Sequence, residues 1–350
     1  MIPIELLFTL APPILLVVVG VAAFRHRERT SKAWMGLARR HGLEAGPTVP
    51  LVFGHLPVLT GTVHGHGVEI RVVRRGGGKS KSSHTVVQTR LSIPVPAGLK
   101  VTRDTLVGGL LTAMGGQDIP LADPRLDKQL KVQGKSPQAV RDLLDIGVVR
   151  QAMQRFFAHG HYTRVEGAEV IADRRGVLTG AVLDEMLAST IGLVTAMSEG
   201  RESAWNDLAT RHGLEHSDDR VVRLSGGRDG AAVCIESTGR KTRLTVEVVG
   251  FDLRVHICAG DGGFVEKDQI LGHRVCITGD ASALPAQFGP AQLDALRGDL
   301  MQVFETWPDT ELRDGRLEVL LPGEPFRKLD LMLVDYRSLA EALHRTISGR

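Results

Sequence analysis

Histidines occur twice in the chain at a spacing that suits metal binding. His64 and His66 are separated by one glycine, and His159 and His161 repeat this arrangement. Alternate residues of a strand share one face, so such a pair can hold Zn²⁺ when further ligands are near. A later segment resembling the surroundings of His64 carries other residue types at both positions. We therefore expect exposed turns here and no metal site.

The three cysteines are the other metal-ligand candidates. Cys234, Cys258 and Cys276 each lie in an apolar, strand-like run, and His256 and His273 are close to two of them. The spacings match no zinc pattern. An odd number of cysteines inside apolar runs is typical of reduced, buried thiols. We expect neither a metal nor any other cofactor.

A basic loop has a composition that could contact phosphate groups. Arg74, Arg75, Lys79 and Lys81 surround three consecutive glycines. The loop departs from the phosphate-binding pattern G-x-x-x-x-G-K-[ST], because a valine stands where the first glycine belongs and a strand, not a helix, follows. Two interpretations stay open: a solvated hairpin loop, or a contact with an anionic surface such as lipid headgroups.

No recognisable catalytic motif occurs in the sequence. The patterns G-x-S-x-G, H-E-x-x-H and the dinucleotide glycine fingerprint are all missing. A non-enzymatic role is therefore the first interpretation. Because catalytic groups assemble in space, an enzyme with a site at the junction between the two sequence copies described next stays as the alternative.

The chain contains an internal duplication. Residues 34–44 read WMGLARRHGLE and residues 205–215 read WNDLATRHGLE, with eight of eleven positions identical. The similarity continues with drifting offsets, as insertions in loops would produce. The identities include three that we treat as a structural repeat signature, and its members are Trp34, His41, Gly42, Trp205, His212 and Gly213.

Each signature position has a structural interpretation. The two tryptophans stand on an apolar helical stripe and are expected to anchor a first helix to a sheet. The histidines fall in the last helical turn, where a cation favours the negative end of the helix dipole. Gly42 and Gly213 occupy the place of a C-cap glycine.

The periodicity changes in the same order in both copies. A helix is followed by strand-like alternation, by helical segments, by two short strands and by a closing helix; in the first copy Leu183, Met186, Leu187, Thr190, Ile191 and Val194 make one face of that helix. Several strands follow one another without helical crossovers, which favours antiparallel pairing. We predict an α+β fold with two homologous copies, at residues 34–199 and 201–348.

The N-terminus carries a candidate membrane span. Residues 6–24 contain no charged side chain, and a helix of this length covers about 28 Å, close to the thickness of bilayer hydrocarbon. A cleaved signal peptide is the rival, but no Lys or Arg precedes the apolar run. We predict a transmembrane helix in residues 1–24, followed by a juxtamembrane segment at residues 25–33.

Charge supports an orientation and excludes one class of partner. Residues 25–40 carry a net charge of +5, whereas residues 201–350 carry −5. The positive-inside rule places the N-terminus outside and the domains in the cytoplasm. Basicity next to the membrane, with few aromatic residues, argues against nucleic-acid binding. The leading hypothesis is a single-pass membrane protein whose tandem domains bind or scaffold an unidentified protein partner.

Overall fold

A computed structural model provides the structure. It describes residues 25, 28–51, 54–76, 81–103, 118–160, 162–218, 221–228, 231–248, 255–259, 275–279, 290–313 and 315–348. The predicted membrane span at residues 6–24 lies outside this part of the chain, as do Lys79, His161, His273 and residues 26–27 of the juxtamembrane segment.

The described chain has an α+β fold with two antiparallel eight-stranded sheets, which confirms the predicted fold class. The first sheet has the order β1-β2-β3-β4-β8-β7-β5-β6. Its strands are β1 (Glu44–Leu51), β2 (Gly54–Val63), β3 (His66–Arg75), β4 (Ser82–Arg90), β5 (Lys100–Arg103), β6 (Leu130–Gln133), β7 (Arg164–Glu166) and β8 (Glu169–Arg175).

The second sheet repeats this order. Read from β9, it runs β9-β10-β11-β12-β16-β15-β13-β14, so each strand has a counterpart at the same place in the first sheet. Its strands are β9 (Glu215–Asp218), β10 (Val222–Arg228), β11 (Ala231–Ser237), β12 (Lys241–Val248), β13 (Val255–Ala259), β14 (Val275–Gly279), β15 (Glu311–Arg313) and β16 (Arg316–Pro322).

Helices flank the sheets in the order that the periodicity predicts, apart from a short helix over Pro124–Gln129, where only strands were expected. A helix over residues 28–41 precedes β1. The others are α3 (Pro124–Gln129), α4 (Pro137–Leu144), α5 (Gly147–Phe156), α6 (Gly180–His212), α8 (Pro290–Thr306) and α9 (Phe326–Ser348). Proline at the first helical position and an N-cap side chain, Asp123 or Ser136, begin α3 and α4.

The chain divides into two compact units. The first comprises residues 1–92, 100–133 and 147–198, and the second comprises residues 93–99, 134–146 and 199–350. The long helix α6 is continuous: residues 180–198 belong to the first unit and residues 199–212 to the second. One helix therefore contributes residues to both units.

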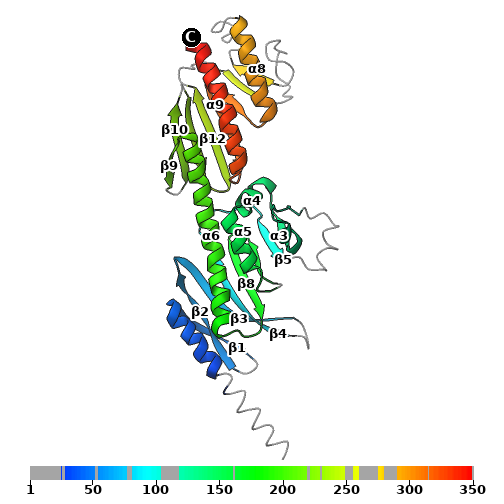
Figure 1. Ribbon diagram of the computed structural model, residues 1–350, viewed down its shortest axis with the longest axis vertical. Helices are drawn as coiled ribbons and strands as arrows, with labels where there is room; N and C mark the ends of the chain where they lie inside the picture. Colours follow the sequence, from blue (N-terminus) through cyan, green and yellow to red (C-terminus); the bar gives the residue numbers. More distant parts are fainter. Residues whose placement is uncertain are drawn as a thin grey trace, which may run out of the picture. The chain divides into compact units, whose positions relative to one another are not determined.

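Each unit has an apolar core between its sheet and its helices. All six residues expected on one face of the first closing helix are buried. In the second unit α9 packs on β11 and β12, and Figure 1 shows it lying along one face of these strands. Leu244, Val246 and Val319 lie on that face and are at most 2% exposed. On the opposite face of this sheet, side chains such as Leu320 and Arg243 are exposed, and no described element packs on them; we call it the open face.

Of the described helices, α6 alone is long and apolar enough to cross a membrane. Its apolar side chains include Met186, Val194, Trp205 and Leu208, all 0% exposed. They pack inside the cores of the two units. This helix therefore does not replace the N-terminal segment as the candidate anchor.

Candidate functional site

In each unit, an arginine and the signature histidine at the end of the first helix contact one aspartate of the closing helix. We call this three-residue contact the Arg-His-Asp clamp, and name each by its aspartate. In the first unit, Arg40 Nη2 lies 2.7 Å from Asp184 Oδ2, and His41 Nε2 lies 3.2 Å from Asp184 Oδ1. In the second unit, Arg211 and His212 contact Asp330 of α9 in the same way, with His212 Nε2 2.8 Å from Oδ1. The histidines thus have a carboxylate partner on the closing helix, which sequence reasoning missed.

The C-cap glycines have the predicted conformation. Gly42 and Gly213 have φ values of +65° and +58°, in the left-handed region that glycine adopts without strain. The next strand passes close by: a Cβ added at Gly61 or Gly226 would lie 3.2 Å from the carbonyl oxygen of Gly42 or Gly213, respectively. The two glycine pairs therefore allow the same close approach of strand and helix end.

The signature tryptophans are both 0% exposed. Trp34 Nε1 donates to the carbonyl oxygen of Leu178 at 3.0 Å, whereas Trp205 Nε1 has no hydrogen-bond partner among the described residues. Both rings anchor a helix in a core, and neither reaches a surface where a ligand could bind. The two tryptophans therefore stabilise the fold.

The residues that differ between the two units, and are therefore candidates for a site, lie on the faces of the sheets. Asp173 of β8 is 1% exposed, although it is charged and lies on the face of its strand opposite Val170 and Ala172. Arg75 Nε donates to Asp173 Oδ2 at 2.7 Å. Burying a carboxylate is costly unless charged and polar partners satisfy it. Arg75 is one such partner.

The second partner of Asp173 is His84 of β4. His84 Nδ1 lies 2.8 Å from Asp173 Oδ1, and His84 Nε2 lies 2.9 Å from Ser82 Oγ. A carboxylate can only accept, so Nδ1 carries the proton that it donates to Asp173. In the neutral imidazole Nε2 is then an acceptor, and Ser82 donates its hydroxyl proton to it. Ser82, His84 and Asp173 are thus linked by two successive hydrogen bonds, in which Ser82 donates to His84 and His84 donates to Asp173.

Tyr162 lies beside these hydrogen-bonded residues. Its ring stands edge-on to His84, with centroids 5.4 Å apart, and the Arg75 guanidinium lies 4.9 Å from the Tyr162 centroid. Tyr162 is 53% exposed and Ser82 is half-buried, so this side of the cluster faces solvent. We call Arg75, Ser82, His84, Tyr162 and Asp173 the Asp173 cluster.

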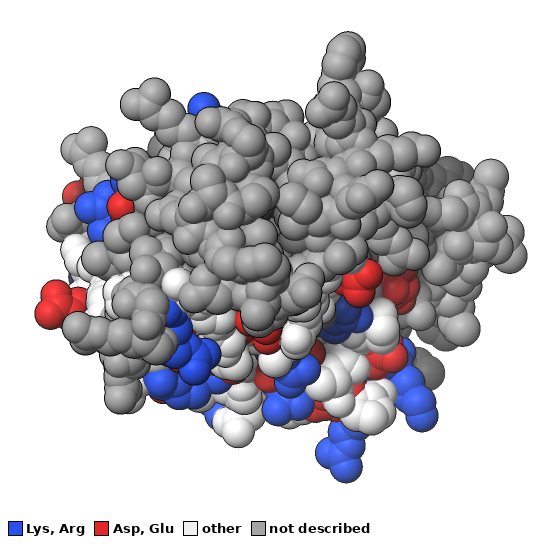
Figure 2. Space-filling view, turned by 90° about the horizontal axis from the view of Figure 1, so that it is seen from above, with Lys and Arg blue, Asp and Glu red and all other residues white. Residues whose placement is uncertain are grey.

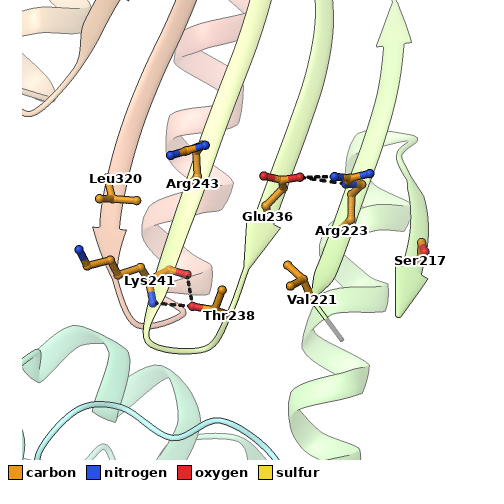
Figure 3. A pocket seen from close by; sticks show the side chains of 8 residues that line it. All are labelled: Ser217, Val221, Arg223, Glu236, Thr238, Lys241, Arg243 and Leu320. Carbon is orange, nitrogen blue, oxygen red and sulfur yellow. Dashed lines mark hydrogen bonds and ion pairs between the residues drawn. The ribbon is translucent and has the colours of Figure 1, made fainter. Parts of the chain in front are cut away.

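The counterpart of this cluster in the second sheet is a hollow (Figure 3). Strand pairing aligns the two places: Thr85 pairs with Arg174, and Thr242 pairs with Leu321. Thr85 and Thr242 also make the same hydrogen bond, to the carbonyl oxygens of Gly176 and Gly323. One residue earlier on each strand, His84 and Asp173 correspond to Lys241 and Leu320.

The hollow has a volume of about 800 Å³ and lies on the open face of the second sheet. Figure 3 shows its lining side chains standing on the side of the strands away from α9. They are Ser217, Val221, Arg223, Glu236, Thr238, Lys241, Arg243 and Leu320. Leu320 is 48% exposed and Val221 38%, so apolar surface lies next to charged groups.

Most charges in the hollow are already paired. Arg223 pairs with Glu236, and Arg243 Nε lies 3.0 Å from Glu318 Oε1. Lys241 is exposed, and its ammonium forms no ion pair within the described residues. In the surface view of Figure 2, acidic and basic side chains likewise lie interspersed over the part drawn in colour. The hollow is therefore close to neutral apart from Lys241.

A second hollow lies between α5 and α6 of the first unit, with a volume of about 560 Å³. His159 Nε2 lies 2.6 Å from Ser189 Oγ at its edge. Ser189 donates its own proton to the carbonyl oxygen of Met186, so His159 is the donor in this pair. Burial lowers the pKa of His159, which keeps the ring neutral. A histidine that activates a serine must accept the hydroxyl proton, whereas His159 donates a proton to Ser189.

The residues of the basic loop are placed differently from one another. Arg74 and Lys81 are exposed at the ends of β3 and β4, Arg75 turns to Asp173, and Lys79 lies outside the described residues.

The histidines of the His-x-His pairs also separate: His64 lies in an exposed turn, and His66 Nε2 contacts Thr195 Oγ1 at 3.3 Å.

The metal candidates do not assemble in the part of the chain that the structure describes. No group of three or more His, Cys, Asp or Glu side chains there is arranged to hold an ion. Cys234 is a half-buried free thiol, and burial raises its pKa. Cys258 and Cys276 occupy directly opposed positions on β13 and β14.

Comparison with known proteins gives no relative. No protein-family model matches the chain, and no curated protein or solved structure is significantly similar to it.

Proposed function

We propose that this protein is a single-pass membrane protein that displays two duplicated α+β domains in the cytoplasm and binds a protein partner through the second. The observation that carries the binding role is the hollow on the open sheet face. Its exposed apolar side chains are positioned by rigid strands, which is typical of a recognition surface.

Duplication is supported by four independent features. The copies share eight of eleven residues at their first helix. Their sheets have the same strand order. The Arg-His-Asp clamp and the close approach of a strand glycine to the helix C-cap occur in both. The side chains at the place of the Asp173 cluster differ, as expected when duplicated domains acquire separate roles.

The anchor is supported by the uncharged segment at residues 6–24 and the basic residues after it. Deleting residues 1–24 should release the protein from membranes into the soluble fraction. A cysteine introduced at the C-terminus should be protected from an impermeant thiol reagent in intact cells and become reactive after lysis. Reaction in intact cells would reverse the orientation.

The chemistry of the hollow fits a protein segment with one apolar side chain and one carboxylate. Leu320 and Val221 offer the apolar contact, and Lys241 is the cation whose charge the described residues leave uncompensated. Burying an exposed leucine is worth about 1.5–3 kcal/mol, whereas an exposed ion pair is worth about 1 kcal/mol or less. We expect Leu320 to supply most of the affinity and Lys241 the specificity.

Site-specific photocrosslinking tests this surface. A photoreactive phenylalanine analogue at position 320 of the full chain, in its native membrane, should yield a discrete protein adduct. The adduct should disappear when Lys241→Glu is added. The matched control is position 331 on α9, where Leu331 is also exposed, at 60%. Equal adducts from both positions, or an adduct indifferent to Lys241→Glu, would contradict the proposal.

Anionic lipid remains a proposed second partner, through Arg74, Arg75, Lys79 and Lys81. Each basic side chain at an anionic surface contributes about 1 kcal/mol. Because Arg75 also holds Asp173, the informative change is Arg74→Ser with Lys81→Ser. Residues 31–350 should co-sediment with phosphatidylserine vesicles at low salt, and the double variant should bind more weakly. Equal sedimentation would leave the loop as a solvated hairpin.

A further inference from the structure

We propose that Ser82 is an activated nucleophile, with His84 as its general base and Asp173 orienting His84, and that the first unit reacts with small activated acyl esters. This activity goes beyond the binding role proposed above and resides within one unit. It depends on the order of the hydrogen bonds, Ser82 Oγ to His84 Nε2 and His84 Nδ1 to Asp173 Oδ1, at 2.9 and 2.8 Å. That order is the one that nucleophilic serine catalysis requires.

The direction of proton donation distinguishes the Ser82–His84 pair from the pair formed by Ser189 and His159. When the His84 ring is neutral, Ser82 directs its proton at Nε2, the ring nitrogen that can accept it. Ser189 directs its proton at a backbone carbonyl and receives one from His159. Of these two serines, Ser82 is therefore the one that can transfer its proton to histidine as its oxygen attacks.

The fold does not need these residues. At the corresponding positions of the second sheet, His84 and Asp173 are matched by Lys241 and Leu320, and the strand order is unchanged. The residue two positions before Lys241 is Gly239, in the turn that precedes β12. An apolar side chain at the place of Asp173 forms an equivalent sheet without the cost of burying a carboxylate. A buried carboxylate with its hydrogen-bonded partners, absent from an equivalent sheet, indicates a functional role more than a packing role.

The proposed step is an acyl transfer. Ser82 Oγ bonds to the carbonyl carbon while its proton moves to His84 Nε2. The bond to the leaving alcohol then breaks, and that oxygen takes the proton from His84. Water repeats the sequence in reverse, attacking the acyl group with its proton passing to His84, and releases the acid with Ser82 restored.

Arg75 limits the rate that we expect. Asp173 accepts from Arg75 as well as from His84, so less of its negative charge is available to stabilise an imidazolium. Changing the triad aspartate lowers the turnover of a serine protease by about 10⁴-fold. We therefore expect slow turnover, and a covalent probe is a more sensitive test than hydrolysis.

A fluorophosphonate probe on the detergent-solubilised full chain tests the proposal. Attack by Ser82 forms the P–O bond, fluoride leaves, and the proton goes to His84. Peptide mass spectrometry of the wild type should place a single adduct on Ser82. Ser82→Ala should abolish labelling, and His84→Gln should slow it at least about 100-fold.

Ser83 is the matched control. It is half-buried like Ser82 and adjacent to it, but its side chain points to the other face of β4. Ser83→Ala should leave the labelling rate unchanged. Absence of an adduct on the wild type, an adduct on Ser83, or labelling that persists in Ser82→Ala would overturn the proposal. Mapping the adduct on the wild type keeps the test valid even if a variant fails to fold.

Discussion

Arg201 and Glu324 form a buried, bidentate ion pair in the second unit. Arg201 Nε and Nη2 each lie 2.6 Å from one oxygen of the Glu324 carboxylate, and both side chains are 9% exposed. Ser237 Oγ donates to the same carboxylate at 2.7 Å. The pair thus joins the second half of α6 to the turn before α9.

Removing one partner of this pair should be strongly destabilising. Arg201→Met would leave Glu324 buried without its cation, and we expect a loss of about 3–5 kcal/mol in the free energy of unfolding, measured by urea denaturation. Arg316→Gln is the control, because its pair with Glu247 is exposed and worth about 1 kcal/mol or less. Similar losses from both variants would disprove this account.

The Asp184 clamp should make stability depend on pH. Burial raises the pKa of Asp184, but hydrogen bonds from Arg40 and His41 outweigh burial, so the net pKa is lowered. A lowered pKa stabilises the folded state above the unfolded value of about 3.9, and this stability is lost as pH falls through the folded value.

Asp184→Asn should therefore reduce stability at pH 6 by about 0.5–1 kcal/mol, since the carboxylate is partly exposed, and have little effect near pH 2. Thermal unfolding at both pH values measures this. Glu185→Gln, at the exposed neighbouring position, should show no such difference between the two pH values. A loss from Asp184→Asn that is equal at both would count against the clamp.

Tyr336 and Thr310 share a buried hydrogen bond between their hydroxyl groups. Burial raises the pKa of Tyr336, so the phenol stays protonated throughout the physiological range. Tyr336→Phe should cost about 1–3 kcal/mol because Thr310 loses its partner. Adding Thr310→Val should recover part of that loss, since no polar group is then left unsatisfied. A double-mutant cycle measures the coupling, and a coupling of zero would rule it out.

The two signature tryptophans should differ in their response to the same substitution. Trp34→Phe removes the hydrogen bond to Leu178, whereas Trp205→Phe removes an N–H group that has no partner among the described residues. Both changes shrink a buried ring equally. We expect Trp34→Phe to cost about 1 kcal/mol more in urea denaturation. The reverse order would mean that Trp205 has a polar partner.

Local periodicity predicted the elements well, because it depends on residues close in sequence. The closing-helix face from Leu183 to Val194 and the C-cap glycines at 42 and 213 follow from spacing alone. The cluster could not be predicted in this way, since Asp173 and His84 meet only when β8 pairs with β4, far along the chain. The one signal was a carboxylate, Asp173, directly after the apolar residues Val170, Ile171 and Ala172.

The same limit explains the Arg-His-Asp clamps. Arg40 and His41 were visible as conserved between copies, but their partner Asp184 lies more than 140 residues later. Comparing the closing helices would have revealed the signal, because LDEML at residues 183–187 and LDLML at residues 329–333 place Asp184 and Asp330 at the same position.

The alternation of the chain between the two units has a consequence for dividing the protein. Residues 134–146, which include α4, belong to the second unit, and Asp142 accepts a hydrogen bond from the backbone N–H of Arg327 at 3.3 Å. A break in the polypeptide after residue 198 would separate α4 from the elements on which it packs. The two halves, produced as separate polypeptides, should then behave as complementary fragments that regain structure on reassociation, and neither half corresponds to an interchangeable module.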